Sequence, residues 1–155
     1  MNKKYRITGL ILIVVLATIM ISGCIGDDNP TNDKFTNEVI VKGETFYLPD
    51  GYVLTDTSIG SDYEEYTYSN GTNNIYIAYF TGSVAKILSD DKLNQRISNI
   101  KEDITYNGYD GYTTTYTLNG GNVYKLFTFE KNGKTFDIQI DNSLNFEEYI
   151  VKILR

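Results

Sequence analysis

Carboxylates are the side chains of this sequence with the clearest chemical potential, because the chain has no histidine and a single cysteine, Cys24. Histidine is the commonest general base and a common metal ligand, so its absence removes the usual way to activate a nucleophile or hold zinc. Acidic residues occur in adjacent pairs at Asp27-Asp28, Glu64-Glu65, Asp90-Asp91, Glu102-Asp103 and Glu147-Glu148. Two carboxyl groups that flank a cleft could hydrolyse a glycoside, so a carboxylate-dependent glycan hydrolase is one hypothesis.

The local geometry of these pairs argues against that chemistry. Neighbours on a strand point to opposite faces, so Glu64 and Glu65 cannot act together. Asp90-Asp91 and Glu147-Glu148 are expected near helix starts, where negative charge is favourable. Residues 141–145 carry oxygen ligands at alternate positions, but they lack the glycine and distant glutamate of a calcium loop and are expected to cap a helix. We therefore predict no catalytic residue, no cofactor and no metal site.

Alternating apolar and polar residues predict a mainly β domain. Strands are expected over 46–48, 52–55, 64–68, 74–80, 104–106, 109–118, 122–131 and 134–141. The strand over 74–80 is apolar on both faces, which predicts a central strand covered on both sides. On the last strand, the face with Phe136, Ile138 and Ile140 is expected to be buried. The face with Asp137, Gln139 and Asp141 is expected to contact water.

Asn-Gly pairs lie between these predicted strands, at 70–71, 107–108, 119–120 and 132–133. Lys131-Asn132-Gly133-Lys134 has the form of a two-residue type I′ hairpin, which requires a positive φ at both central positions. Asn119-Gly120-Gly121 is a slightly longer version. The last three strands are therefore expected to form an antiparallel meander.

Two helices complete the prediction. Within 84–100, Val84, Ile87 and Leu88 form one apolar cluster, and Leu93, Ile97 and Ile100 form another that does not share its stripe. With Ser89-Asp90-Asp91 as an N-cap, we expect a helical turn, a break and a helix over about 90–99; one long helix is the alternative. Residues 145–154 form an amphipathic C-terminal helix. The expected fold is α+β, a twisted antiparallel sheet of about seven to eight strands with an internal and a C-terminal helix.

The first 24 residues carry a localisation signal. Three basic residues precede fifteen uncharged, mostly apolar residues over 7–21, and small residues precede Cys24. Ile21-Ser22-Gly23-Cys24 resembles the lipobox of prokaryotic lipoproteins, in particular archaeal ones. The resemblance implies a signal peptide over 1–23, cleavage between Gly23 and Cys24, and a lipid on Cys24. An uncleaved membrane anchor is the alternative, although fifteen residues span about 22 Å of a hydrocarbon core about 30 Å thick.

Lipidation would hold a single domain, 38–155, at the cell membrane, on the extracellular or periplasmic side. Residues 24–37 would form the lipidated N-terminus and a polar tether. Cleavage removes three of the 14 basic residues and none of the 20 acidic ones, which leaves a net charge of −9. This charge argues against nucleic-acid binding, which needs a basic surface. A lipid on the only cysteine would also remove thiol chemistry from the domain.

The segment Phe46-Tyr47-Leu48-Pro49-Asp50-Gly51-Tyr52 resembles the opening of small PsbP-like domains, in which an aromatic strand leads into a proline–glycine turn. It is also similar to small domains of archaeal and bacterial surface lipoproteins. The resemblance extends over roughly 38–155 and implies an α/β/α sandwich. It implies no catalytic residue, and a fold does not by itself define a function.

These observations favour a non-catalytic binding or assembly module whose partner is an envelope protein or a glycan. The hydrolase and a structural envelope spacer are the alternatives. Asn70-Gly71-Thr72 matches the N-glycosylation acceptor pattern at an expected hairpin tip. Thirteen of the 14 tyrosines follow the leader; they either form a recognition surface or fill half-buried sheet positions, and we favour the second interpretation.

Intact-mass analysis of the protein extracted from its native membrane tests the lipobox. The expected mass is that of residues 24–155 plus a diacylglyceryl-type lipid, because two acyl chains are what stable anchoring generally requires. Unlipidated protein that retains Met1 would contradict the prediction.

Overall fold

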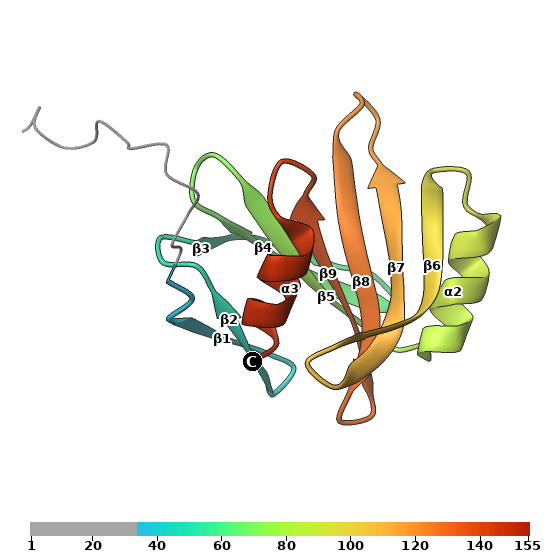
Figure 1. Cartoon of the computed structure of the whole chain (residues 1–155), viewed down its shortest axis with the longest axis horizontal. Helices are drawn as coiled ribbons and strands as arrows, with labels where there is room; N and C mark the ends of the chain where they lie inside the picture. Colours follow the sequence, from blue (N-terminus) through green and yellow to red (C-terminus); the bar gives the residue numbers. More distant parts are fainter. Residues whose placement is uncertain (1–33) are drawn as a thin grey trace, which may run out of the picture. The chain divides into compact units, whose positions relative to one another are not determined.

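The computed structural model describes residues 34–155, which form an α+β fold, as predicted (Figure 1). The fold contains two antiparallel sheets and two helices. The strands are β1 (Asn37–Val41), β2 (Glu44–Leu48), β3 (Val53–Ile59), β4 (Tyr63–Ser69), β5 (Asn74–Phe80), β6 (Ile97–Tyr106), β7 (Tyr109–Thr117), β8 (Val123–Lys131) and β9 (Lys134–Asp141). The helices are α2 (Val84–Leu93) and α3 (Phe146–Ile153). Neither of these two helices has the length and apolar character needed to cross a membrane.

The large sheet consists of two antiparallel runs that meet at one pairing. Its strand order is β3-β4-β5-β9-β8-β7-β6, so β3 to β5 and β6 to β9 are each consecutive in the sequence. The pairing of β5 with β9, with Ile77 opposite Ile138, joins the two runs. β1 and β2 form a separate hairpin. The large sheet thus has seven strands, within the expected range, and the hairpin adds two.

Asn-Gly turns connect the C-terminal strands. Asn132 and Gly133 have φ values of 52° and 74°, as a type I′ turn requires. Asn107 and Gly108 have φ values of 49° and 82° and join β6 to β7 in the same way. The predicted meander of the last three strands is confirmed, and the Asn107 turn adds β6 as a fourth strand.

The Pro49-Asp50-Gly51 turn does not form a hairpin. The backbone N–H of Tyr52 donates to the oxygen of Pro49 (3.3 Å), and Gly51 has a φ of 88°, as expected in a type II turn. β2 pairs with β1, so the turn carries the chain to the edge of the large sheet, where β3 begins. The strands predicted over 46–48 and 52–55 therefore belong to different sheets.

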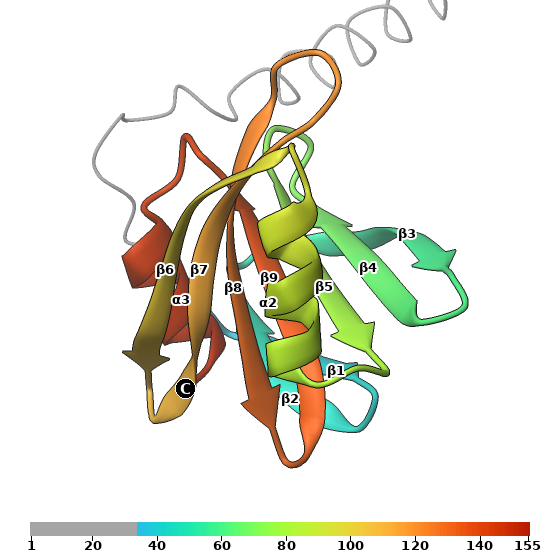
Figure 2. The ribbon, with the colours of Figure 1, turned by 90° about the vertical axis from the view of Figure 1, so that its right-hand side faces the viewer.

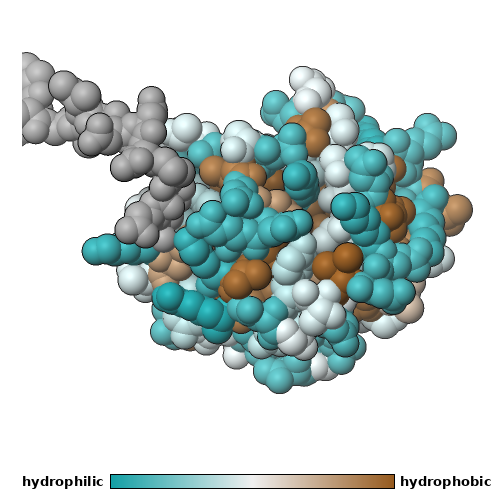
Figure 3. Space-filling model, in the orientation of Figure 1, coloured by the Kyte–Doolittle hydropathy of each residue, from teal (hydrophilic) through white to brown (hydrophobic). Residues whose placement is uncertain are grey.

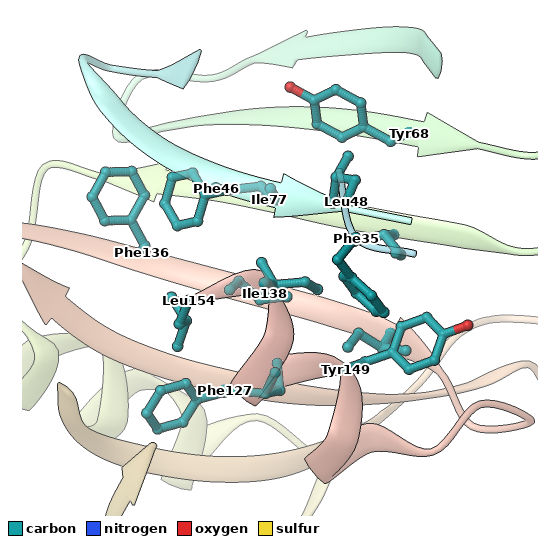
Figure 4. Close-up of a cluster of buried hydrophobic side chains, with 14 of the residues drawn as sticks. Phe35, Phe46, Leu48, Tyr68, Ile77, Phe127, Phe136, Ile138, Tyr149 and Leu154 are labelled. Atoms are coloured by element: carbon teal, nitrogen blue, oxygen red, sulfur yellow. The ribbon is translucent and has the colours of Figure 1, made fainter. Parts of the chain in front are cut away.

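One face of the large sheet carries the hydrophobic core. Alternate residues of its central strands point to this face and are fully buried, among them Ile77, Phe127 and Ile138. α3 and the β1–β2 hairpin cover them (Figure 4). The covering side chains are Phe46, Leu48, Phe146, Tyr149, Ile150 and Ile153.

The C-terminal helix is confirmed. The Asn145 side chain accepts a hydrogen bond from the backbone N–H of Glu148, and Glu147 and Glu148 lie in the first turn of α3. The backbone N–H of Ser143 donates to the Asp141 carboxylate at 2.9 Å. Residues 141–145 thus form a turn and a helix cap, as the sequence predicts.

The folded domain begins before residue 38, so the C-terminal boundary predicted for the tether over 24–37 is too late in the sequence. Phe35 is 3% exposed and packs edge-on against Tyr149 of α3, with ring centroids 5.1 Å apart (Figure 4). The Phe35 oxygen accepts a hydrogen bond from the Arg155 guanidinium, and β1 begins two residues later. A single aromatic side chain within a polar stretch therefore extends the domain.

α2 covers the opposite face of the sheet, and its position differs from the prediction (Figure 2). The Ser83 hydroxyl caps it by accepting from the backbone N–H of Lys86 (3.3 Å). Ser89-Asp90-Asp91 lies inside the helix, not at its start. Both the helix over 90–99 and the single long helix are wrong, because β6 begins at Ile97. Ile97 and Ile100 have a spacing that fits a helix, but β6 pairs with β7 instead.

Gly111 of β7 allows the close approach of β8. A Cβ atom at this position would lie 2.0 Å from the backbone oxygen of Thr128, so the backbone of β7 or β8 must shift if a Cβ is added. We expect Gly111→Ala to lower the free energy of unfolding by about 1–3 kcal/mol, the usual effect of overpacking, in urea unfolding.

Gly82→Ala is the matched control. Its Cβ would meet the flexible side chain of Lys86 at 3.3 Å, so we expect a change within about 0.5 kcal/mol. Equal effects of the two substitutions would show that the contact of Gly111 with β8 is not a tight one.

Candidate functional site

A row of mostly polar side chains crosses the sheet on the α2 face. Strand pairing places each residue opposite the next, in the order Tyr112, Thr128, Asp137, Ala78 and Glu65. At the β7 end, the Tyr112 hydroxyl donates a hydrogen bond to the carboxylate of Asp91 on α2 (2.9 Å). We call these five residues, together with Asp91, the polar row.

Asp137 is a carboxyl group buried near the centre of the sheet. It is 4% exposed and accepts a hydrogen bond from the Thr128 hydroxyl. The pKa of Asp137 is raised to about 7, mainly by burial; the Thr128 hydrogen bond opposes this shift, and the nearby charges of Asp91 and Glu65 add to it. The prediction that this face of β9 contacts water is wrong at Asp137, because α2 lies over this part of the sheet (Figure 2).

Asp91 joins α2 to the row. Burial raises the pKa of the Asp91 carboxyl and that of the Tyr112 hydroxyl. α2 contains no fully buried residue, although Val84, Ile87 and Leu88 are half-buried, so polar contacts of this kind contribute to its attachment. A second such contact is the ion pair between Lys92 and Glu102 of β6 (2.6 Å).

Glu65 ends the row on β4. It accepts a hydrogen bond from Gln139 of β9 at 3.2 Å, past the small side chain of Ala78. Burial raises the pKa of the Glu65 carboxyl. Glu64 lies on the other face, where it pairs with Lys42 and accepts a hydrogen bond from Tyr66. The prediction that Glu64 and Glu65 point apart is confirmed.

The polar row has three carboxyl groups, those of Asp91, Asp137 and Glu65, but their exposure does not suit hydrolysis. A general acid must lie within hydrogen-bond reach of the group that it protonates. Asp137 lies beneath α2 and is already hydrogen-bonded to Thr128. A buried, internally satisfied network of this kind specifies one packing of helix on sheet, and we interpret the row in that way.

An acidic cleft of about 600 Å³ lies between α2 and strands β6 and β7. Its carboxylates are Glu102, Asp103, Asp110 and Glu130. Glu102 pairs with Lys92, and Asp110 accepts a hydrogen bond from the Thr105 hydroxyl (2.6 Å). Within residues 34–155, no three acidic or cysteine side chains are grouped so that they could hold a metal ion. The cleft is a solvated acidic surface.

A different cavity, which we call the α3 groove, lies between the start of α3 and strands β6 to β8. Its volume is about 580 Å³, within the range of sites for small organic molecules. Its main polar residues are Asn99, Lys101, Thr113, Thr115, Lys125 and Glu147. Tyr106 and Phe146 contribute aromatic surface.

Two lysines of the α3 groove stand on either side of β7. Lys101 of β6 lies opposite Thr113, and Lys125 of β8 lies opposite Thr115, so all four residues share one face of the sheet. Both lysines are exposed, and neither forms an ion pair with another residue of the described part of the chain. The α3 groove therefore presents two cations that form no ion pair, together with the carboxylate of Glu147, in a chain whose net charge is −6.

The site residues that the sequence predicts lie elsewhere. Gly23 and Cys24 are outside the described residues. Asn70 is exposed on the β4–β5 hairpin, and its side-chain oxygen accepts from the backbone N–H groups of Thr72 (2.9 Å) and Asn73 (2.8 Å). These bonds explain Asn70 as a turn residue, and its glycosylation stays a prediction.

Most tyrosines pack against the sheet. In the described part of the chain only Tyr63 is exposed, at 40% of its surface, and the others are buried or half-buried. Hydrophobic residues form small separate patches on the face shown in Figure 3. The interpretation of the tyrosines as sheet-packing residues is confirmed, so the α3 groove is a better candidate site than a tyrosine-rich surface.

Sequence reasoning missed Lys101 and Lys125. Neither belongs to a motif, and the two are brought to one groove by the pairing of β6 and β8 with β7. The helix predicted over 90–99 contributed, because it includes residues 97–99, where β6 begins. No local pattern signals this convergence.

Comparison with models of known protein families finds no match to this chain. Comparison with curated proteins finds no significant relative. The likeness to PsbP-like domains and the lipobox therefore stay predictions from the sequence.

The burial of Asp137 predicts a pH dependence of stability. The native protein keeps the Asp137 proton up to about pH 7, whereas an unfolded aspartate loses it near pH 4. The native state thus binds more protons between these values, so the free energy of unfolding falls as the pH rises through this window, by on the order of 4 kcal/mol.

Asp137→Asn keeps an acceptor for Thr128 but cannot ionise, so we expect it to remove the slope of the free energy of unfolding between about pH 4 and pH 7. Glu130→Gln, an exposed change on the neighbouring strand, is the control and should keep that slope. Urea unfolding at a series of pH values measures it. An unchanged slope in Asp137→Asn would show that Asp137 is not its source.

Proposed function

We propose that this chain is a lipid-anchored, non-catalytic binding module that faces the extracellular or periplasmic side of the cell membrane. The proposed anchor is a lipid on Cys24, and the proposed ligand site is the α3 groove. The partner is a component of the cell envelope rather than a nucleic acid, because the domain is acidic.

The α3 groove is the observation that carries the binding role. It combines about 580 Å³ of open volume with two lysines that have no ion-pair partner within residues 34–155. Charged and hydroxyl groups that converge on open space are what a small-molecule site provides.

The two other hypotheses receive less support. A carboxylate-dependent hydrolase needs accessible acid and base groups, and Asp137 is buried under α2. The acidic cleft has accessible carboxylates, but Glu102 is paired with Lys92 and Asp110 is hydrogen-bonded to Thr105. An envelope spacer needs no cavity, and the α3 groove has no role in that hypothesis.

Hydrogen–deuterium exchange of the full lipidated protein in detergent micelles tests the proposed site. The ligand panel consists of neutral and acidic mono- and disaccharides. We expect at least one of them to slow exchange in peptides that cover 99–106, 113–115 and 144–147, because a bound sugar shields the amides that line the α3 groove.

Thr113→Trp should abolish this protection, because the larger side chain fills the α3 groove. The control, Thr117→Trp, makes the same change on the same strand at an exposed position outside the groove, and should keep the protection. Protection confined to β3–β5, or none with any sugar of the panel, would contradict the proposed site.

A further inference from the structure

The backbone of β6 is distorted on both sides of Lys101. Its register against β7 shifts between Ser98 and Lys101 and again between Lys101 and Ile104. Asn99 and Asp103, one in each irregularity, have φ values of 52° and 54°. A left-handed conformation is unfavourable for a residue with a side chain, though least so for asparagine and aspartate. Lys101 is thus held between two bulges, a device that re-aims a side chain at a sheet edge.

This distortion points to a ligand for Lys101. Backbone strain concentrates at functional sites, where the surrounding structure maintains it. In the described part of the chain Lys101 forms no ion pair, so the two bulges do not serve an internal contact of its ammonium group. They place it in the α3 groove on the same side of the sheet as Lys125.

The other residues that line the α3 groove indicate which further chemical groups the ligand carries. Between the two lysines, the hydroxyl groups of Thr113 and Thr115 face the α3 groove from β7. The side-chain amide of Asn99 donates a hydrogen bond to the Thr115 hydroxyl (3.5 Å), and Tyr106 adds an aromatic ring. Hydroxyl and amide groups match a polyhydroxylated molecule, and an aromatic ring matches the apolar face of a sugar. The two lysines match an anionic group.

We propose that the α3 groove binds a sugar that carries a carboxylate, a uronic acid unit of an envelope glycan. Its carboxylate lies between Lys101 and Lys125, and its hydroxyl groups bond to Thr113, Thr115 and Asn99. Glu147, on the α3 side of the groove, accepts a hydrogen bond from a further hydroxyl group of the sugar. This inference rests on the proposed function, because it names the ligand class of the same groove.

Titration calorimetry with methyl glucuronoside and its methyl ester tests the ligand class. The two probes differ in the charge of one group. With the full lipidated protein in detergent micelles, we expect the acid to bind about tenfold or more tightly than the ester, as charge-assisted hydrogen bonds to lysine would produce. Lys101→Gln and Lys125→Gln should each weaken binding of the acid and leave that of the ester unchanged.

Lys86→Gln is the matched control, because Lys86 is an exposed lysine on α2, outside the α3 groove. It should leave both affinities unchanged. Equal affinity for acid and ester, no effect of either groove lysine, or displacement of the acid by an equal concentration of acetate would overturn the inference. Protection of the groove by neutral sugars would then still support the binding module, whereas no protection by any sugar would overturn both.

Discussion

The pairing of β5 with β9 is the constraint on which the rest of the structure depends. Each half of the large sheet is a run of consecutive antiparallel strands, and the pairing of β5 with β9 joins the two halves into one sheet. Six residue pairs form this ladder, and on one side of it Ile75, Ile77, Ile138 and Ile140 are fully buried. Long-range pairing of this kind carries the loop-closure cost of the chain between the strands.

The same pairing creates the two unlike faces of the sheet. On one face it aligns isoleucine with isoleucine, and α3 and the β1–β2 hairpin pack on the result. On the other face it brings Ala78 between Asp137 and Glu65 and so completes the polar row. α2 rests on that row through Asp91 and has no buried apolar side chain of its own. The stability of α2 is therefore coupled to the ionisation of carboxyl groups, whereas that of α3 comes from apolar burial.

Local signals explain which parts of the fold are predictable from the sequence. Three features depend only on residues that are neighbours in the sequence, and the sequence predicts all three. They are the type I′ turn at Asn132-Gly133, the C-terminal meander and the apolar stripe of α3. Ile97 and Ile100 were assigned to a helix because a short apolar cluster fits both periodicities, and strand pairing decides between them. The burial of Asp137 and the convergence of Lys101 with Lys125 depend on sheet order, which no single segment encodes.

The central claim is that the α3 groove holds the ligand, and intermolecular nuclear Overhauser effects test it most directly. With methyl glucuronoside as the probe, the protons of the sugar ring should show these effects to the methyl groups of Thr113 and Thr115 and to the ring of Tyr106, which line the groove. Effects that reach only Tyr63 and Phe80, at the far side of the sheet, would contradict the account.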